Sequence, residues 1–128
     1  MINPADTMPF SKLMEIRITD ASQDAIIGEL IVRPDLCTTR HIIHGGAIMA
    51  FADALGAVGA FMTLPEGAKG TTTIESSTKF LGAAKEDSTI IGTAKPVKIG
   101  KRLSVWQTEI ETADGKPVAL VTQTQLVL

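Results

Sequence analysis

The sequence predicts an α+β fold in which a curved, mostly antiparallel sheet of five to six strands wraps around one long central helix. Two observations predict it. The first is a single apolar stretch, residues 47–64, which is too long for a strand and rich in alanine. The second is the order of elements, because two strand patterns precede this stretch and four follow it. A chain of 128 residues suits one core better than two, so we expect a single domain over residues 1–128.

Strand patterns lie on both sides of the helix. Residues 1–13 contain two prolines and are expected to form no more than a short helical turn. After them, apolar and polar side chains alternate, and Pro34 ends the returning strand. The predicted strands cover residues 14–19, 25–33, 71–81, 88–95, 103–112 and 118–128. Asp114-Gly115, between the last two, is a strong hairpin signal.

The apolar stretch could also be a membrane span, but its composition argues against that. It contains one charged residue, Asp53, and a charge near the centre of a bilayer costs roughly 2.5–3.5 kcal/mol on insertion scales. Gly56 and Gly59 interrupt the stretch as well. We therefore interpret it as a buried core helix, kept thin by alanine and glycine so that a sheet can approach closely.

Asp53 is the residue of this helix that needs a chemical explanation. An isolated ionised carboxylate buried among alanines is very unfavourable unless it is hydrogen-bonded, paired or neutralised. One interpretation is structural, with the carboxylate bonded to a nearby threonine or backbone group. The other is functional, with Asp53 facing a pocket in which partial desolvation increases its basicity or nucleophilicity.

His44-Gly45-Gly46 stands at the expected start of the helix. Free backbone N–H groups and the positive end of the helix dipole suit a polarised carbonyl or a developing oxyanion there, and glycine lets a ligand approach the backbone. Asp53 lies about two turns further on, ~11 Å along the axis. Within one chain that is too far for both groups to act on one carbonyl. Cooperation between them would bring Asp53 from a second subunit, which favours a homodimer.

Charge and composition indicate which classes of partner to expect. Apolar residues make up 45% and charged residues 20% of the chain, and the net charge is −2. This balance argues against extended disorder, and without a basic stripe we expect no nucleic-acid partner. The one basic cluster, Lys98, Lys101 and Arg102, suits a small phosphorylated ligand better than a polymer.

Cysteine and histidine are too few for several other kinds of site. Cys37 is the single cysteine, so there is no intrachain disulfide, and we interpret it as a small apolar side chain. The two histidines, His41 and His44, lie in one loop, and we expect neither a metal site nor a cofactor. No basic start followed by an apolar segment opens the chain, so cytoplasmic residence is the default expectation.

The helix start resembles a known family. His44-Gly-Gly-Ala-Ile-Met-Ala-Phe-Ala-Asp53 is similar to the His-Gly-Gly…Asp/Glu segment of hot-dog fold thioesterases, in the branch that contains phenylacetyl-CoA and 4-hydroxybenzoyl-CoA thioesterases. Similar segments follow at Thr73-Ile-Glu-Ser-Ser-Thr-Lys-Phe80-Leu, Gly100-Lys-Arg102 and Asp114-Gly-Lys-Pro-Val-Ala119. The resemblance covers residues 14–128. It implies the hot-dog fold and hydrolysis of an acyl- or aryl-CoA to free acid and CoA, in a homodimer with shared active sites or a dimer of dimers.

The resemblance also implies catalytic roles. The Gly45 N–H would polarise the thioester carbonyl, and His44 would orient the neighbouring loop or contact the thioester. Asp53 of the partner subunit would act as nucleophile or as general base for water. Thr73 matches a Ser/Thr position that orients the water or the carboxylate, with the two preceding threonines, Thr71 and Thr72, as competitors.

The resemblance also implies substrate contacts, and the sequence departs from the family pattern at one position. The implied substrate contacts are Gly46 and three side chains of the hairpin, Lys98, Lys101 and Arg102. The three basic side chains would contact the CoA phosphates, although a solvated turn explains their presence equally well. Thr38 stands six residues before the histidine, where the family usually carries Asn or Gln to place substrate or water.

Two other functions remain compatible with the sequence. One is a hot-dog hydratase or dehydratase, although such sites pair histidine and acid in other patterns. The other is a non-catalytic hot-dog protein that binds acyl-CoA, with Thr38 as a trace of lost catalysis. Hydrolysis of acyl-CoAs, with Asp53→Asn as control, separates them.

Overall fold

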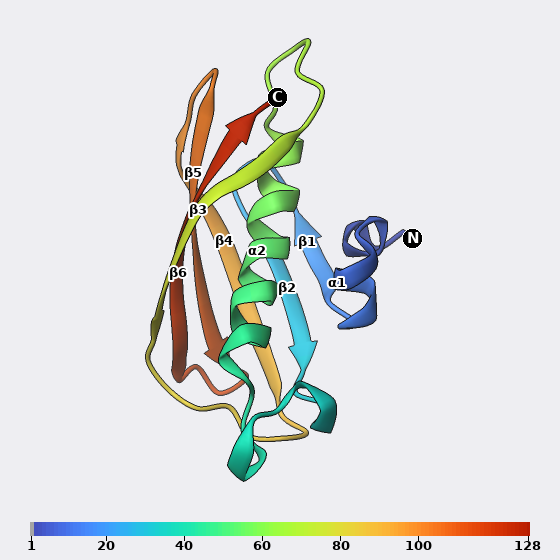
Figure 1. Cartoon of the computed structure of the whole chain (residues 1–128), viewed down its shortest axis with the longest axis vertical. Coiled ribbons are helices and arrows are strands. Elements are labelled where there is room, and N and C mark those ends of the chain that lie inside the picture. Colours follow the sequence, from blue (N-terminus) through green and yellow to red (C-terminus); the bar gives the residue numbers. More distant parts are fainter. Residues whose placement is uncertain (1) are drawn as a thin grey trace.

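One six-stranded antiparallel sheet curves around a long helix in the computed structural model, which describes residues 2–128 (Figure 1). The strand order is β1-β2-β4-β5-β6-β3, so β1 and β3 form the two edges. The elements are α2 (Gly45–Met62), β1 (Arg17–Ala21), β2 (Ile26–Ile31), β3 (Thr71–Phe80), β4 (Thr89–Ile99), β5 (Leu103–Thr112) and β6 (Pro117–Val127). The predicted α+β class, with six strands around one helix, is confirmed.

The central helix is displaced by two residues from its predicted bounds of 47–64. It begins at Gly45 because the His44 side chain caps it, accepting a hydrogen bond from the Gly46 N–H at 2.8 Å. It ends at Met62, since the residue before Pro65 is disfavoured in helical backbone. Both glycines therefore belong to the first turn of the helix.

The first strand starts later than its alternating pattern suggests. Met14 and Ile16 are buried, but they lie where α1 (Pro9–Leu13) ends, and Glu15 between them has a φ of 60°. In this segment, side chains alternate between buried and exposed although the backbone is not paired with a neighbouring strand. A second short helix, η1 (Pro4–Thr7), precedes α1, so the N-terminal segment forms short helical turns as predicted.

The fourth strand extends beyond its predicted end at residue 95. β4 continues through Pro96 to Ile99, with a register irregularity between Pro96 and Lys98. Proline is tolerated at such a bulge because a ladder bond is already lost there. β2 pairs with β4 only as far as Ala94, so the rest of β4 has one neighbour, β5. The predicted hairpins at Gly100 and at Asp114-Gly115 join β4 to β5 and β5 to β6.

The core lies between one face of α2 and the concave face of the sheet (Figure 1). Trp106 is fully buried there, and a Cβ added at Gly59 would lie 2.5 Å from its ring, so glycine is needed for the helix to pass over the indole. By length and composition alone α2 could cross a membrane. Half of it is buried inside the fold, which is how the core helix of a globular domain behaves.

Candidate active site

Asp53 lies on the outer face of α2, and the expectation that it is buried is wrong for the single chain. Asp53 is exposed in the single chain, and Met49 and Phe61 on the same face are 42% and 65% exposed. The helix packs one face on the sheet, and the described residues leave much of its other face uncovered. The carboxylate thus lies on an uncovered, largely apolar surface.

Asp53 is held by two side chains of the sheet. The Thr73 hydroxyl donates to Asp53 Oδ1 at 3.0 Å, and the Gln123 side-chain amide donates to the same oxygen at 3.4 Å. Within residues 2–128, Asp53 Oδ2 accepts no hydrogen bond. One carboxylate oxygen is therefore anchored and the other is free to act on a ligand.

Thr73 is itself oriented by a second glutamine. Gln125 donates to Thr73 Oγ1 at 2.6 Å, and its carbonyl oxygen accepts from Thr71 at 3.0 Å. Of the three candidate threonines, Thr73 contacts Asp53, Thr71 contacts Gln125, and Thr72 is exposed. The bulge in β3 after Thr73 separates this cluster from the rest of the strand.

Sequence reasoning missed both glutamines. Gln123 and Gln125 occupy inward-facing positions of β6, in the row of Ala119 and Val121, and are 0% and 1% exposed. The signal was present in the sequence, since polar residues at positions expected to be apolar in an alternating strand need a partner inside the fold.

The start of α2 offers one unused donor. His44 Nδ1 accepts from the Gly46 N–H, which removes Gly46 as a donor to substrate. Neutral His44 then carries its proton on Nε2. The Gly45 N–H has no acceptor within the described residues 2–128, and it points out of the first turn of the helix. Gly45 is thus the backbone donor that remains for a carbonyl oxygen.

The loop before the helix holds Thr38. Leu36 O accepts from the His44 N–H at 2.9 Å and Ile42 O from the Thr38 N–H at 2.8 Å, so the loop folds back on itself. Thr38 is exposed, two residues from the Leu36–His44 pair. His41 has a φ of 58° and lies 3.3 Å from Glu86, which fixes it as a loop residue.

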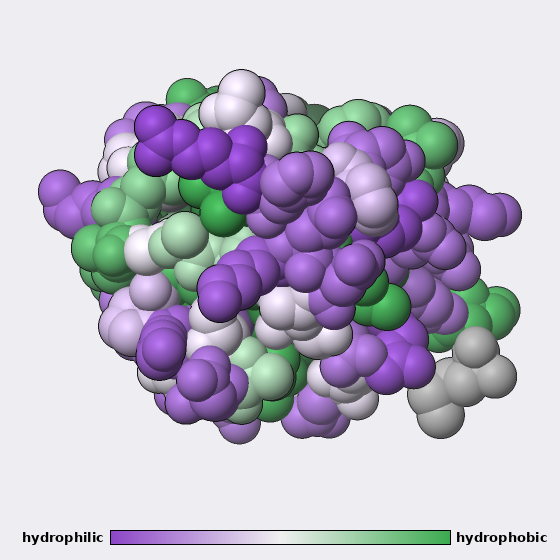
Figure 2. All heavy atoms as spheres, turned by 90° about the horizontal axis from the view of Figure 1, so that it is seen from below, coloured by the Kyte–Doolittle hydropathy of each residue, from purple (hydrophilic) through white to green (hydrophobic). Residues whose placement is uncertain are grey.

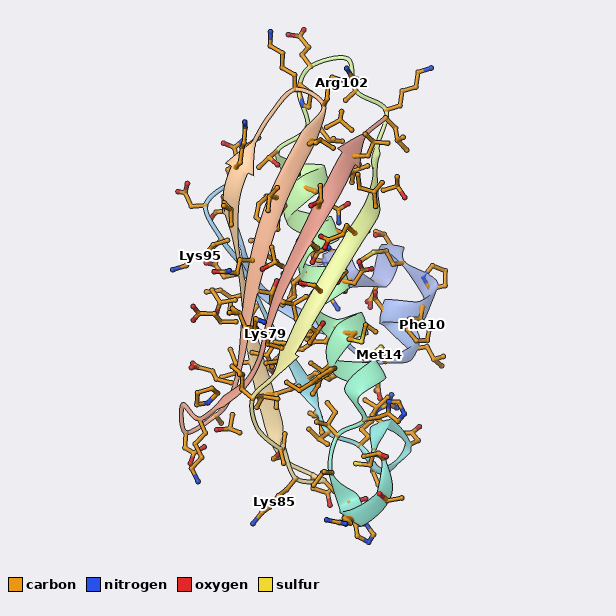
Figure 3. The ribbon with its side chains drawn as sticks, turned by 60° about the vertical axis from the view of Figure 1, so that its left-hand side comes forward. Phe10, Met14, Lys79, Lys85, Lys95 and Arg102 are labelled. Carbon is orange, nitrogen blue, oxygen red and sulfur yellow. The ribbon has the colours of Figure 1, made fainter. Side chains whose placement is uncertain are left out.

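The predicted basic cluster lies away from the start of α2. Lys98, Lys101 and Arg102 are exposed at the β4–β5 turn, and Arg102 O accepts from the Val127 N–H at 2.9 Å. Figure 3 shows Arg102 at the end of the molecule opposite Lys85 and the beginning of α2. The structure therefore does not bring this cluster to Gly45 of the same chain.

Two clefts flank α2. One, of about 390 Å³, lies beside the helix start and is lined by apolar side chains of α1 together with Cys37 and His44. The other, of about 660 Å³, lies along the second half of the helix next to Phe61 and Met62. Figure 2 looks at the end where α2 begins and shows mostly hydrophilic side chains around smaller apolar areas.

Within the described part of the chain, no group of three or more His, Cys, Asp or Glu side chains is placed to hold a metal ion. The chemistry available at the site consists of an anchored carboxylate, a helix-start N–H and polar side chains. These groups suit hydrolysis of an activated carbonyl.

Known proteins with similar sequences support the same chemistry. The model of the thioesterase superfamily matches residues 41–119, more than half of the chain, and the chain belongs to that superfamily. Among curated relatives, the 1,4-dihydroxy-2-naphthoyl-CoA hydrolase of Escherichia coli is 26% identical over 103 residues, which are 80% of this chain and 74% of the relative. The chain is thus a thioester hydrolase, and the superfamily match together with this relative supports acyl-CoA thioesterase activity in general.

Solved structures share the fold. The PaaI protein from the phenylacetic acid degradation operon of E. coli superposes with a TM-score of 0.87 at 20% identity, covering 96% of this chain and 86% of that one. A hypothetical thioesterase from Streptococcus pneumoniae, solved with coenzyme A, gives a TM-score of 0.80 at 20% identity over 88% and 85% of the chains. The predicted hot-dog fold is confirmed.

Proposed function

We propose that this protein hydrolyses acyl- or aryl-CoA thioesters to the free acid and CoA, with Asp53 as the reacting carboxylate and the Gly45 N–H as the oxyanion donor. The observation that carries the proposal is the anchoring of one Asp53 oxygen, while the other is free on an exposed helix face. The S. pneumoniae relative with bound coenzyme A supports CoA as the thiol part of the substrate.

The site is shared between two subunits in this proposal. Gly45 and Asp53 stand on the same helix, ~12 Å apart along its axis, too far to reach one carbonyl. β3 is an edge strand whose Thr73 contacts Asp53, while the Phe80 ring lies near Gly45 at the other end. Antiparallel pairing of β3 with its own copy about a twofold axis brings each end beside the other end of the partner. Asp53 of one subunit then faces Gly45 of the other.

Exposed apolar side chains support that pairing. Ile74 and Phe80 on β3 are 54% and 55% exposed, and Leu81 just after it is 57% exposed. An exposed edge strand with such side chains is a template for pairing with another chain. The apolar outer face of α2 would be covered by the same contact, which would desolvate Asp53 as its chemistry requires.

Two routes for the reaction follow from the free Oδ2. As general base, it accepts a proton from water while the water oxygen adds to the thioester carbonyl; the C–S bond then breaks and the proton passes to the CoA sulfur. As nucleophile, Oδ2 itself adds to the carbonyl and CoA leaves, and water then cleaves the resulting anhydride. In both, the Gly45 N–H donates to the oxygen on which negative charge develops.

Other residues take supporting roles in the proposal. His44 presents its Nε2–H beside Gly45, within reach of a thioester there. The CoA phosphates would be contacted by Lys98, Lys101 and Arg102. In the shared site these side chains would come from the subunit that supplies Asp53 and Thr71–Thr73. Thr38, in the loop before His44, would place water or substrate through its hydroxyl.

The test is release of free thiol from a panel of acyl- and aryl-CoAs. We expect hydrolysis by the wild type and at least about a hundredfold loss of kcat in Asp53→Asn, because the amide neither accepts a proton nor attacks. The matched control is Asp24→Asn, the same change at an exposed turn, which should keep wild-type activity. Equal hydrolysis by wild type and Asp53→Asn would show that the site is wrong, and binding of CoA derivatives without any hydrolysis would favour a binding protein.

The two routes are separated by mass spectrometry. Acid quenching of a single turnover should yield an acylated Asp53 peptide if the carboxylate is the nucleophile. If Asp53 is the base, the peptide keeps its unmodified mass throughout the turnover.

A further inference from the structure

Two buried glutamines under the active-site helix have no explanation in the roles proposed so far. Gln123 and Gln125 extend from β6 beneath α2 and are almost completely buried. A buried polar side chain that lacks partners costs about 1–3 kcal/mol, so apolar residues would be the ordinary choice at these positions. Their hydrogen bonds lead to Asp53, either directly or through Thr73.

The hydrogen bonds around Gln125 have a fixed direction. An ionised carboxylate only accepts, so the single proton of the Thr73 hydroxyl must go to Asp53 Oδ1. Thr73 Oγ1 can then only accept from its other neighbour, so Gln125 must turn its NH₂ group to Thr73, as it does at 2.6 Å. The Gln125 carbonyl is left to accept from the Thr71 hydroxyl. The chain from Thr71 to Asp53 therefore runs one way.

Gln123 adds a second donor to the same carboxylate oxygen, and the helix leaves room for it at Gly56. A Cβ added at Gly56 would lie 2.2 Å from Gln123 Oε1 and 2.7 Å from Nε2. A glycine in the middle of a helix costs about 1 kcal/mol relative to alanine. Gly56 stands three residues after Asp53, so the space it leaves places the Gln123 amide beside the carboxylate.

We propose that Gln125 and Gln123 are positioning residues of the active site. Gln125 fixes the Thr73 hydroxyl toward Asp53, and both donors fall on Oδ1, which leaves Oδ2 as the oxygen that reacts with water or thioester. This inference rests on the proposed function of Asp53. It assigns to the glutamines a part in the reaction that they perform without touching substrate.

The first test replaces Gln125 with Met and with Glu. Met keeps the length without hydrogen bonds, and Glu offers acceptors only, so it takes the Thr73 proton away from Asp53. Both changes should lower kcat by about 10–100-fold through misplacement of the carboxylate, with KM unchanged. The matched controls are Gln107→Met and Gln107→Glu, because Gln107 donates to Thr122 between neighbouring strands, away from Asp53. They should keep wild-type kcat; wild-type kcat in the Gln125 variants would overturn the proposal.

A double-mutant cycle separates positioning from folding. If Gln125 acts through Asp53, then Gln125→Met should cause no further loss in the Asp53→Asn background. An equal loss in both backgrounds would overturn the proposal, because a merely structural residue slows both. Likewise Gly56→Ala should lower kcat by displacing the Gln123 amide, and should add little once Gln123 is replaced by Ala.

NMR provides a readout that does not depend on activity. In wild type, the side-chain NH₂ signals of Gln125 should exchange slowly with solvent and should shift in both Thr73→Val and Asp53→Asn, while those of Gln107 stay in place. Signals that respond to neither change would overturn the hydrogen-bond chain. If the wild type hydrolyses no thioester, the proposed function fails, yet this experiment still decides whether the glutamines hold the carboxylate.

Discussion

In the proposed mechanism the backbone N–H of Gly45 is the one donor that stabilises the developing oxyanion, and the residues around Gly45 determine how this role can be tested. His44 has φ −70° and ψ 137°, the extended backbone that a residue before proline adopts. Gly45 is the first residue of the helix, where proline is well tolerated because its N–H is not used by the helix. Proline at this position therefore removes the donor with little effect on the helix.

We expect Gly45→Pro to lower kcat by about 10²–10³-fold, the usual cost of losing one oxyanion donor. Gly45→Ala is the control, because it keeps the N–H and adds a Cβ 3.2 Å from the exposed Phe80 ring. Thiol-release kinetics and thermal melting of both variants provide the measurement. Full activity in Gly45→Pro would remove this N–H from the mechanism.

Cys37 lies in the cleft beside His44, near the start of α2. Its thiol is a second candidate nucleophile, besides the carboxylate of Asp53. Burial first, and then the carboxylates of Glu86, Asp87 and Asp35, raise the pKa of the Cys37 thiol above its ordinary value. The reactive thiolate is therefore scarce at neutral pH. We expect iodoacetamide to modify Cys37 more slowly than free cysteine at pH 8, and Cys37→Ala to hydrolyse thioesters at the wild-type rate. Loss of activity in Cys37→Ala would point to a catalytic thiol instead.

At the scale of elements, the β5–β6 hairpin shows how a turn stabilises the strand that carries the glutamines. The Thr112 hydroxyl donates to Asp114, and the Lys116 N–H donates back to Thr112 Oγ1 at 3.0 Å. Gly115 has a φ of 89°, which other residues adopt only with strain. The turn fixes the register of β6, and hence which of its residues face α2.

The same turn makes the stability of the fold depend on pH. The hydrogen bond from Thr112 is the main cause that lowers the pKa of Asp114 below its ordinary value, with Lys116 also contributing. A carboxyl with a lowered folded-state pKa stabilises the fold above its unfolded-state pKa of about 3.9, and this contribution is lost as pH falls through the folded-state value. The difference in Tm between wild type and Asp114→Ala should therefore be present at neutral pH and shrink below about pH 4.

Glu111→Ala provides the control, since Glu111 is an exposed acid of the same hairpin that accepts no side-chain hydrogen bond within residues 2–128. Its effect on Tm should not follow this profile. A pH-independent difference for Asp114→Ala would contradict the assignment.

Much of the element order could be predicted from the sequence, because periodicity and turn chemistry are local properties. The single apolar stretch predicted α2 to within two residues, and Asp114-Gly115 predicted its hairpin. The start of β1 was wrong, since Met14 and Ile16 are buried by packing at the end of α1 and not by a ladder. Local patterns do not distinguish these two causes of burial.

The candidate site was predictable only in part. Spacing along one helix related Asp53 to Gly45, but the contacts of Asp53 with Thr73 and Gln123 join residues 20 and 70 positions away, and only the strand order brings them together. The expected burial of Asp53 was wrong for the single chain because apolar composition does not reveal which face of a helix the sheet covers.

At the scale of the whole molecule, the groups of the proposed site lie at two separate places on one chain. Asp53 with Thr73 lies toward one end of β3, and Gly45 with His44 lies toward the other, near Phe80. If twofold pairing of β3 joins the halves, each active site takes its carboxylate from one subunit and its N–H from the other. Lesions in the two halves should then complement each other.

Mixing two inactive variants tests this directly. Asp53→Asn subunits keep a sound N–H, and Gly45→Pro subunits keep a sound carboxylate, so a mixed dimer contains one intact site and one doubly damaged site. After unfolding and refolding an equal mixture, half of the dimers are mixed, and the activity should rise to about a quarter of wild type, as follows from twofold symmetry. Each variant refolded alone controls for recovered activity, and sedimentation velocity checks that dimers have formed. A mixture no more active than its components would place both groups in a single subunit, and the shared site would have to be abandoned.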